Sequence, residues 1–234
     1  MRDVFGVYNM RSRISVGVIV LAPLIIQIYI LFPVARNISS TLIITGITFS
    51  FSNLLILIAR LNGGKVLHKC FPDGLPAQSF LIPEDTTLDE FTKERYYKFF
   101  QKHLRKFKVT DNAADMKQKS ESAIKWLIAR TRNSTKFPLI AEENINLGFA
   151  YNILGVKPFG IMICVVSAVG NIVIMKLQKQ TYFLVDNAEL LLSMIFTIGY
   201  LLMWVFLINK KLVKNSAKKY AFALLAACDS GYFD

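Results

Sequence analysis

The chain has 234 residues, of which 53% are hydrophobic, with a mean hydropathy of +0.41 and a formal net charge of +12. Soluble domains carry about 45–50% apolar residues without long uninterrupted runs, so this composition excludes an ordinary soluble domain and predicts a membrane protein. Three scattered cysteines, Cys70, Cys164 and Cys228, are not a disulfide framework and are compatible with a reducing compartment.

Four apolar runs are each long enough to cross a hydrocarbon core of roughly 30 Å as helices. We expect them at residues 14–35, 41–59, 158–175 and 187–208. The first run is too long for a signal-peptide core and has no small-residue cleavage site, so we expect it to remain as a membrane helix. The sequence therefore predicts an all-α membrane protein with four transmembrane helices in two hairpins, which flank a small, mainly helical domain.

These runs divide the chain into four parts. Residues 1–60 form the first hairpin, 61–157 a basic domain, 158–208 the second hairpin and 209–234 a basic, amphipathic tail that lies on a surface or packs. Gly and Pro are frequent in residues 61–85, which predicts an irregular segment at the start of the basic domain.

The charge distribution predicts the topology. Residues 60–157 hold 17 Lys and Arg against 11 Asp and Glu, whereas one short turn holds Arg36 and the other Lys176 and Lys179. By the positive-inside rule, both termini and the basic domain are cytoplasmic. We expect a multi-pass membrane protein.

Helix-start patterns indicate three helices in the basic domain. Thr87 and Glu90 match a capping box and predict a helix that runs to about residue 108. Asp111 is the expected N-cap of a second helix at 112–132. The third helix is expected at 141–154.

Residues 137–160, FPLIAEENINLGFAYNILGVKPFG, connect the basic domain to the second hairpin. Glu142 and Glu143 are interpreted as charges at a helix start, where negative charge is favourable. Gly155 is expected to end that helix, and Pro158 precedes the third apolar run. Our hypothesis is that this connector transmits the state of the basic domain to the membrane helices, with Gly155 and Pro158 as its hinge.

The membrane runs contain several polar residues that are pore candidates. Thr41, Thr45, Thr48 and Ser52 fall on one face of the second helix, and Gln27 places an amide near the middle of the first. The hydroxyls either bond to carbonyls of their own helix and pack against another helix, or they line a wet pathway in an oligomer.

Asp186 and Glu189 lie on one face at the mouth of the fourth helix. They either partner Lys176 or Lys179 at the membrane surface, or form acidic rings that attract cations at the mouth of an oligomeric pore.

The first two predicted helices of the basic domain, the one that runs to about residue 108 and the one at 112–132, carry many cations with aromatic residues among them. Such a surface binds phosphates and stacks bases, or it lies against anionic lipid, which also favours positive charge. The candidate ligand residues are Arg95, Lys98, Lys102, Arg105, Lys117, Lys125, Trp126, Arg130 and Arg132.

Catalytic and metal-binding motifs are not evident. Gly63-Gly64-Lys65 lacks the spacing of a phosphate-binding P-loop, and His68 and Cys70 have no second pair of ligands nearby. We therefore expect no enzymatic activity, no metal and no cofactor.

The overall layout, together with Trp126–Arg132 (WLIARTR) and the connector at 137–160, resembles the Hailong-type membrane effectors of bacterial anti-phage systems. The resemblance implies a tetrameric channel of the bacterial inner (cell) membrane that is held shut by single-stranded oligoadenylate made by a partner nucleotidyltransferase. Loss of this ligand during infection opens the channel and depolarises the cell. We therefore expect a homo-oligomeric, ligand-gated channel. The alternative is a membrane anchor or scaffold that recruits a cytoplasmic partner and has no pore.

Overall fold

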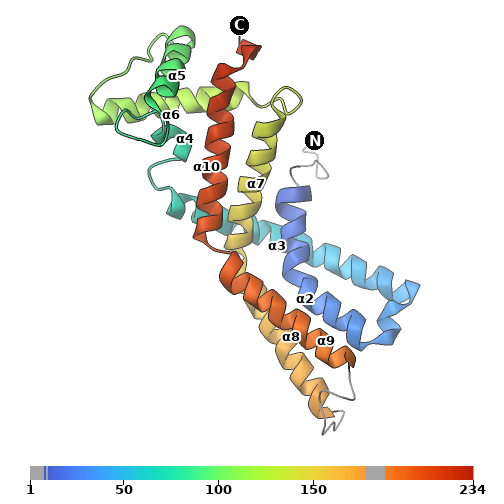
Figure 1. Ribbon diagram of the computed structural model, residues 1–234. Helices are drawn as coiled ribbons and strands as arrows, with labels where there is room; N and C mark the ends of the chain where they lie inside the picture. The colour runs from blue at the N-terminus through green and yellow to red at the C-terminus, as the bar shows by residue number, and fades with distance from the viewer. Residues whose placement is uncertain (1–7, 9, 178–187, 234) are drawn as a thin grey trace. The chain divides into compact units, whose positions relative to one another are not determined.

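The computed structural model describes residues 8, 10–177 and 188–233, and most of these are helical (Figure 1). The elements in chain order are η1 (Met10–Ile14), α2 (Ser15–Leu31), η2 (Pro33–Arg36), α3 (Ile38–Cys70), α4 (Pro76–Ser79), α5 (Glu90–His103), α6 (Ala113–Arg130), α7 (Pro138–Gly155), α8 (Lys157–Leu177), α9 (Ala188–Leu202), η3 (Met203–Leu207), α10 (Lys210–Ala226), η4 (Ala227–Asp229) and η5 (Gly231–Phe233). The segments η1 and η3 are π-helical, and the other η segments are 3-10 turns. No strand occurs in the described ranges, so the all-α prediction is confirmed.

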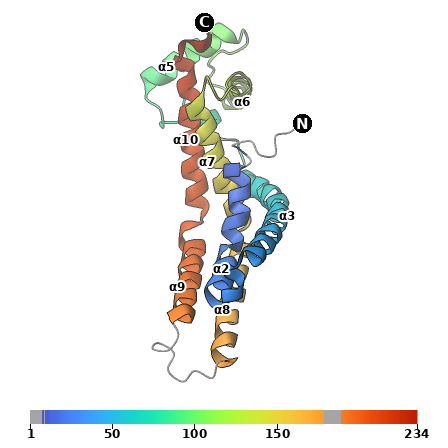
Figure 2. The same cartoon turned by 90° about the vertical axis from the view of Figure 1, so that its right-hand side faces the viewer.

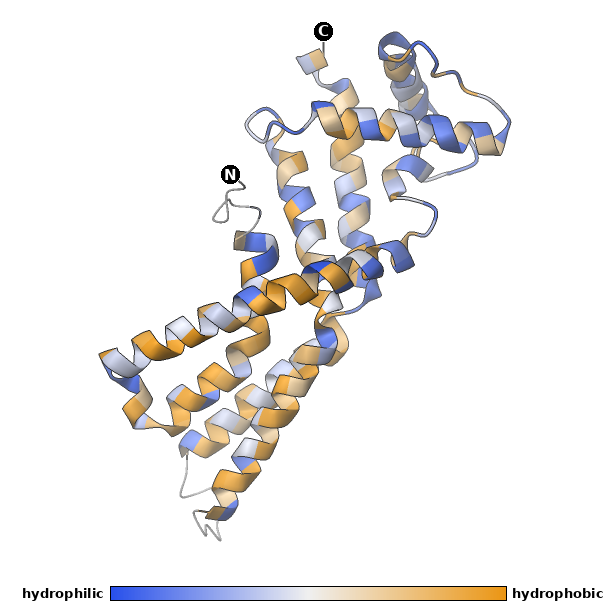
Figure 3. Cartoon of the chain, turned by 180° about the vertical axis from the view of Figure 1, so that it is seen from behind, coloured by the Kyte–Doolittle hydropathy of each residue, from blue (hydrophilic) through white to orange (hydrophobic). Residues whose placement is uncertain are grey.

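The described residues include four helical spans that are long and apolar enough to cross a membrane: Met10–Leu31, Ile38–Cys70, Lys157–Leu177 and Ala188–Leu207. Figure 3 shows hydrophobic residues along α2, α3, α8 and α9. Only 11–28% of each apolar stretch is buried within the chain, so most of this surface is left for lipid or another protein. The four helices indicate a multi-pass membrane protein, as predicted.

The second apolar helix is longer than the predicted span of 41–59. α3 continues through Gly63 and Gly64 to Cys70, so the prediction of an irregular segment is wrong for residues 61–70. A Cβ at Gly63 would lie 2.7 Å from Asn152 Oδ1, which means that glycine permits a close helix crossing there. This packing outweighs a propensity cost of about 1 kcal/mol for glycine in a helix.

The chain divides into two compact units. The first, which we call the membrane unit, comprises Met1–Val66 and Gly148–Leu212, and the second, the basic unit, comprises Leu67–Leu147 and Val213–Asp234. Most of the predicted tail at 209–234 therefore belongs to the basic unit. The described part of that tail is mainly α10. This helix packs within the basic unit, which is one of the two alternatives expected for the tail.

In the membrane unit, α2, α8 and α9 pack against one another (Figure 2). Trp204 is fully buried beside Gly160 of α8, and a Cβ at that glycine would lie 2.2 Å from the indole ring. Lys157 Nζ donates to the backbone oxygens of Val205, at 3.0 Å, and Ile208, at 2.7 Å. This cation satisfies carbonyls at the end of the fourth span, where helix geometry leaves them unpaired.

The connector differs from the prediction in two respects. α7 begins at Pro138 and has no acidic residue in its first turn, so Glu142 and Glu143 are not helix-start charges. α7 does end at Gly155, but a Cβ there would lie 2.6 Å from Gly63 N, so the glycine marks a tight crossing with α3. The boundary between the two units falls earlier, after Leu147, and the predicted hinge lies inside the membrane unit.

The start of α5 is set by Asp89, whose Oδ1 accepts a hydrogen bond from Thr92 N at 2.9 Å. The predicted cap, Thr87, instead donates its backbone N–H to Asp85 Oδ1 at 2.7 Å, so the capping-box prediction is wrong. The helix ends at His103, before the predicted end near residue 108, because the chain becomes extended at the next residue.

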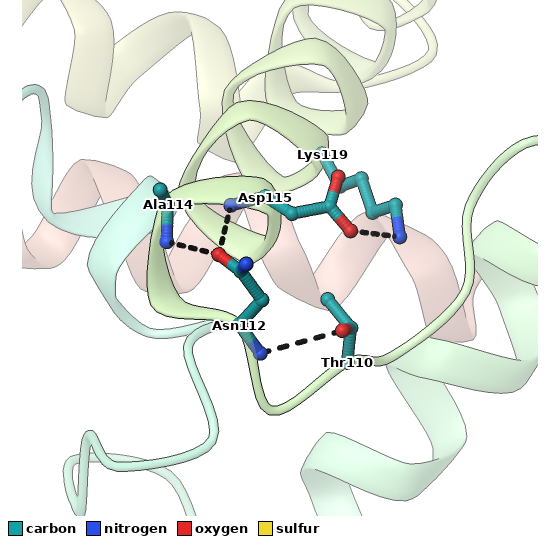
Figure 4. Close-up of polar contacts among 5 residues, drawn as sticks. All are labelled: Thr110, Asn112, Ala114, Asp115 and Lys119. Atoms are coloured by element: carbon teal, nitrogen blue, oxygen red, sulfur yellow. Dashed lines mark hydrogen bonds and ion pairs between the residues drawn. The ribbon is translucent and has the colours of Figure 1, made fainter.

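α6 begins one residue later than predicted. Asn112, not Asp111, is the N-cap, and its Oδ1 accepts hydrogen bonds from Ala114 N and Asp115 N, each at 3.1 Å (Figure 4). The core of the basic unit includes the fully buried residues Leu81, Phe100, Met116, Ile124, Leu127, Leu224 and Leu225. Since two of these come from α10, the C-terminal helix is part of this core.

Candidate functional site

Ion pairs within the basic unit occupy four of the nine predicted ligand residues. These pairs are Arg95–Asp229 at 3.5 Å, Lys98–Glu94 at 2.8 Å, Lys117–Asp73 at 2.8 Å and Lys125–Glu121 at 2.5 Å. The hydrogen bond and then the charge of each lysine lower the pKa of its carboxylic partner. A phosphate would have to compete with these carboxylates, so the four cations are poor first contacts for an anion.

Trp126 is not an open platform for a base. Its ring centroid lies 5.7 Å from that of His103 and 6.0 Å from that of Phe233, and Phe99 lies 6.2 Å away. Arg130 covers the indole, with its guanidinium carbon 5.7 Å from the ring centroid. The predicted base-stacking residue therefore belongs to an aromatic cluster of the unit itself.

One pocket on the basic surface, of about 240 Å³, lies between the turn that follows α5 and the face of α6. Its lining residues are Leu104, Arg105, Lys106, Phe107, Lys119 and Ser122. Arg105 and Lys106 are exposed and form no ion pair with any described residue. The pocket thus combines two available cations, a hydroxyl group and an apolar wall.

The positive charge of this pocket is partly neutralised at one edge, where Lys119 lies. Lys119 Nζ lies 2.6 Å from Asp115 Oδ2, one turn earlier on α6 (Figure 4). Asp115 N is in turn held by the N-cap, which fixes the start of the helix next to the pocket. An entering anion would meet Arg105 and Lys106 first, because Lys119 already has a carboxylate partner.

Of the predicted ligand residues, only Arg105 lines this pocket. Lys102 and Arg132 are exposed elsewhere in the basic unit. Lys106 and Ser122 were missed, because the prediction continued α5 as a regular helix through this segment. A tight turn at Arg105 and Lys106, closed by a hydrogen bond from Phe107 N to Leu104 O at 2.9 Å, brings adjacent residues of different character to one concave site, which no helical periodicity indicates.

A buried polar network joins three helices of the membrane unit. Gln27 Nε2, on α2, donates to Ser167 O at 2.8 Å and to Asn171 Oδ1 at 2.9 Å, both on α8. Ser193 Oγ and Thr197 Oγ1 of α9 also contact the Asn171 amide, at 2.8 Å and 3.4 Å. Gln27 was predicted as a pore residue, but here it bonds the helices together. Buried amides commonly do so in membrane bundles.

The hydroxyl stripe of α3 does not share one environment. Ser52 is buried, and a Cβ at Gly17 of α2 would lie 2.9 Å from its Cα, so this serine marks a close helix crossing. Thr45 is exposed, whereas Thr41 and Thr48 are half-buried. Thr41 Oγ1 donates to Ala35 O at 3.4 Å, which is not the carbonyl one turn earlier in its own helix.

A second polar ridge on α3 was not predicted. Ser50 Oγ donates to Gly46 O at 2.9 Å, and Asn53 Nδ2 donates to Phe49 O at 2.8 Å. Both side chains are exposed, and no atom outside α3 lies within 4 Å of a Cβ built on Gly46. An amide on the uncovered face of an apolar helix is costly in hydrocarbon. The exposure of these side chains therefore marks this face as a candidate contact surface, which the spacing of polar residues in the sequence did not indicate.

Glu189 forms an ion pair with Arg36, at 3.1 Å, and not with Lys176, whereas Lys179 lies outside the described residues. Arg36 also donates to the backbone oxygens of Tyr29 and Ile30, so it ties the turn of the first hairpin to the start of α9. Asp186 lies outside the described residues.

Among the described residues, no cluster of three His, Cys, Asp or Glu side chains could hold a metal ion. Comparisons with models of protein families, with curated proteins and with solved structures give no match to this chain.

Proposed function

We propose that this chain forms a homo-oligomeric ion channel of the bacterial inner membrane that is gated by an anionic nucleotide or oligonucleotide at its basic unit. In the resemblance to anti-phage effectors, the ligand is a single-stranded oligoadenylate from a partner nucleotidyltransferase, and the oligomer is a tetramer. The proposal includes a toxic role, in which the open channel depolarises an infected cell.

The uncovered face of α3 is the main observation that supports a homo-oligomer. The apolar stretch of this helix is only 11% buried, and Thr45, Ser50 and Asn53 are exposed on it. Exposed polar groups in a hydrocarbon layer are unfavourable, and contact with another helix or with water relieves that cost. A ring of α3 helices would supply both. An anchor without a pore gains nothing from polar groups at this depth.

The pocket beside α6 supports an anionic ligand. Arg105 offers the planar donor group that binds phosphate oxygens in pairs, and Lys106 adds a point charge. Phe107 and Leu104 supply apolar surface for the uncharged part of such a ligand. The ligand can bias the gate only if it binds the open and closed states with different affinity.

The cations near the ends of the four spans support the proposed orientation. One set of ends carries Arg11, Arg13, Arg60, Lys65, Lys157, Lys210 and Lys211. The opposite ends carry Arg36 and Lys176 among the described residues. The positive-inside rule then favours a cytoplasmic basic unit.

The test is ion flux from liposomes that contain the purified protein, recorded with and without a short oligoadenylate. We expect flux that changes with the ligand, and a lower unitary conductance when Thr45 and Asn53 are replaced together by Val and Leu. The R105A/K106A double variant should keep the basal flux and lose the response to ligand, whereas K98A should retain both. Absence of flux under every condition would leave the anchor or scaffold as the function.

A further inference from the structure

A groove on the basic unit lies between α7 and α10, which run side by side in Figures 1 and 2. Its volume is about 330 Å³, and its lining residues are Leu139, Glu143, Lys219, Phe222, Ala223 and Ala226. It shares no lining residue with the pocket beside α6. All six residues belong to the basic unit, outside the four apolar spans.

The groove exposes apolar surface that the basic unit leaves uncovered. Leu139 is 58% exposed and Phe222 is 39% exposed, which is high for large apolar side chains next to each other. Ala223 and Ala226 are small, so another helix can approach α10 closely at this point. The shape suits a helix that carries one bulky apolar residue and small neighbours, which is the pattern of α10 itself.

One charge of each sign borders this apolar surface. Glu143 lies on α7 and Lys219 on α10, and neither forms an ion pair with a residue in the described ranges. Within the described part of the chain, Glu143 accepts one long hydrogen bond, at 3.5 Å, from Asn146 Nδ2 on the next turn. Both charges are therefore available to an incoming surface.

From this arrangement we infer that the groove is an interface between two copies of this chain, related by a two-fold axis. Such an axis brings Glu143 of each copy to Lys219 of the other and places Phe222 against the partner's apolar groove. An isologous interface needs a self-complementary patch of this kind. An anionic membrane surface would attract the lysine but repel the carboxylate, so the charge pattern favours a second copy over lipid.

This interface goes beyond the proposed function, because it needs no pore and would also serve a scaffold. It is tested on the full-length protein in nanodiscs that each hold several copies, prepared from equal amounts of light- and heavy-isotope protein. A carbodiimide joins a carboxylate directly to an amine in contact with it. We expect mixed-isotope crosslinked peptides that contain Glu143 and Lys219, and their loss in E143Q.

A charge-reversal cycle gives an independent measurement. E143K and K219E should each weaken self-association by at least about tenfold, and the double variant should restore it, because the pair is re-formed with opposite polarity. E142K and K214E are matched controls next to the groove and should change association little. Association is measured by energy transfer between labelled copies during dilution with lipid.

Two results would overturn the inference. One is an absence of mixed-isotope crosslinks, together with reversal variants that associate like the controls. The other is burial of Leu139 and Phe222 in anionic lipid, with no contact between copies of the chain. Ion flux recorded from liposomes that contain the same variants separates this result from the channel, because the groove can fail while flux persists.

Discussion

The two units of this protein bury opposite types of residue. In the membrane unit, apolar surface faces outward, and a few polar residues such as Gln27 and Asn171 are buried and bonded to one another. In the basic unit, apolar residues are buried, while the polar ones form short-range pairs on the outside, such as Lys125 with Glu121. The rarer residue type specifies the packing in each unit, because it is the type that cannot face the solvent.

This contrast predicts that large apolar residues matter most in the basic unit. Replacing the fully buried Phe100 by Ala should lower the free energy of unfolding by about 3–5 kcal/mol, because it leaves a cavity. F91A on the same helix is the control, since Phe91 is 78% exposed and should cost little. Denaturant unfolding can be followed by Trp126 fluorescence in a Trp204→Phe background. Equal effects of the two changes would contradict the burial pattern.

In the membrane unit, glycine should have the corresponding importance. Gly160→Ala places a methyl group against the Trp204 ring and should destabilise the unit by about 1–3 kcal/mol, the usual cost of overpacking. Gly199→Ala on α9 is the matched control, because its added Cβ meets no other atom within 4 Å. Unfolding in mixed detergent, followed by Trp204 fluorescence in a Trp126→Phe background, measures both variants.

The polar network should show coupling between helices. Gln27→Leu and Asn171→Leu should each destabilise the membrane unit, and the double variant should cost less than the sum. We expect a coupling energy of about 0.6–2 kcal/mol, the range for hydrogen bonds between membrane helices. Strict additivity of the two changes would mean that the 2.9 Å contact does not stabilise the bundle.

Helix capping offers a smaller effect that separates neighbouring residues. Asn112→Ala removes two hydrogen bonds at the start of α6 and should cost about 1 kcal/mol. Asp111→Ala should be close to neutral, because that residue is not the cap. Thermal unfolding of both variants under identical conditions ranks them, and the reverse order would restore the position indicated by sequence alone.

The surface ion pairs should matter least, and only in acid. The pKa of Glu121 is lowered from its ordinary value of 4.5 by the hydrogen bond and charge of Lys125. Its contribution to stability is therefore present above that ordinary value and is lost as the pH falls through the lowered one. Lys125→Ala should remove this part of the pH profile and change neutral stability little, because the pair is exposed. A large loss at pH 7 would contradict this.

The sequence predicted well wherever long-range composition was sufficient. The four apolar spans, the all-α fold and the end of α7 at Gly155 required only hydropathy, length and the rarity of glycine in helices. Its errors lie at positions decided by single contacts. Thr87 and Asp111 are reasonable caps by residue type, but Asp89 and Asn112 have the backbone geometry that lets a side chain reach the free N–H groups.

The candidate ligand site was predicted only in part for a related reason. Periodicity can collect cations on one helical face, but it cannot show which of them already have carboxylate partners. Lys117 is paired with Asp73, which is 44 positions away in the chain. Lys106 became a candidate only because α5 ends early and the chain forms a turn at Arg105 and Lys106.

The sequence by itself determined that this protein belongs in a membrane, which parts cross it and where positive charge accumulates, because these properties depend on composition summed over many residues. The tertiary structure decided which polar groups are internal bonds and which are left available. It made Gln27 and Ser52 packing residues, and it left Asn53, Arg105 and the groove beside Lys219 uncovered. Such distinctions depend on contacts between distant segments, which no local pattern contains.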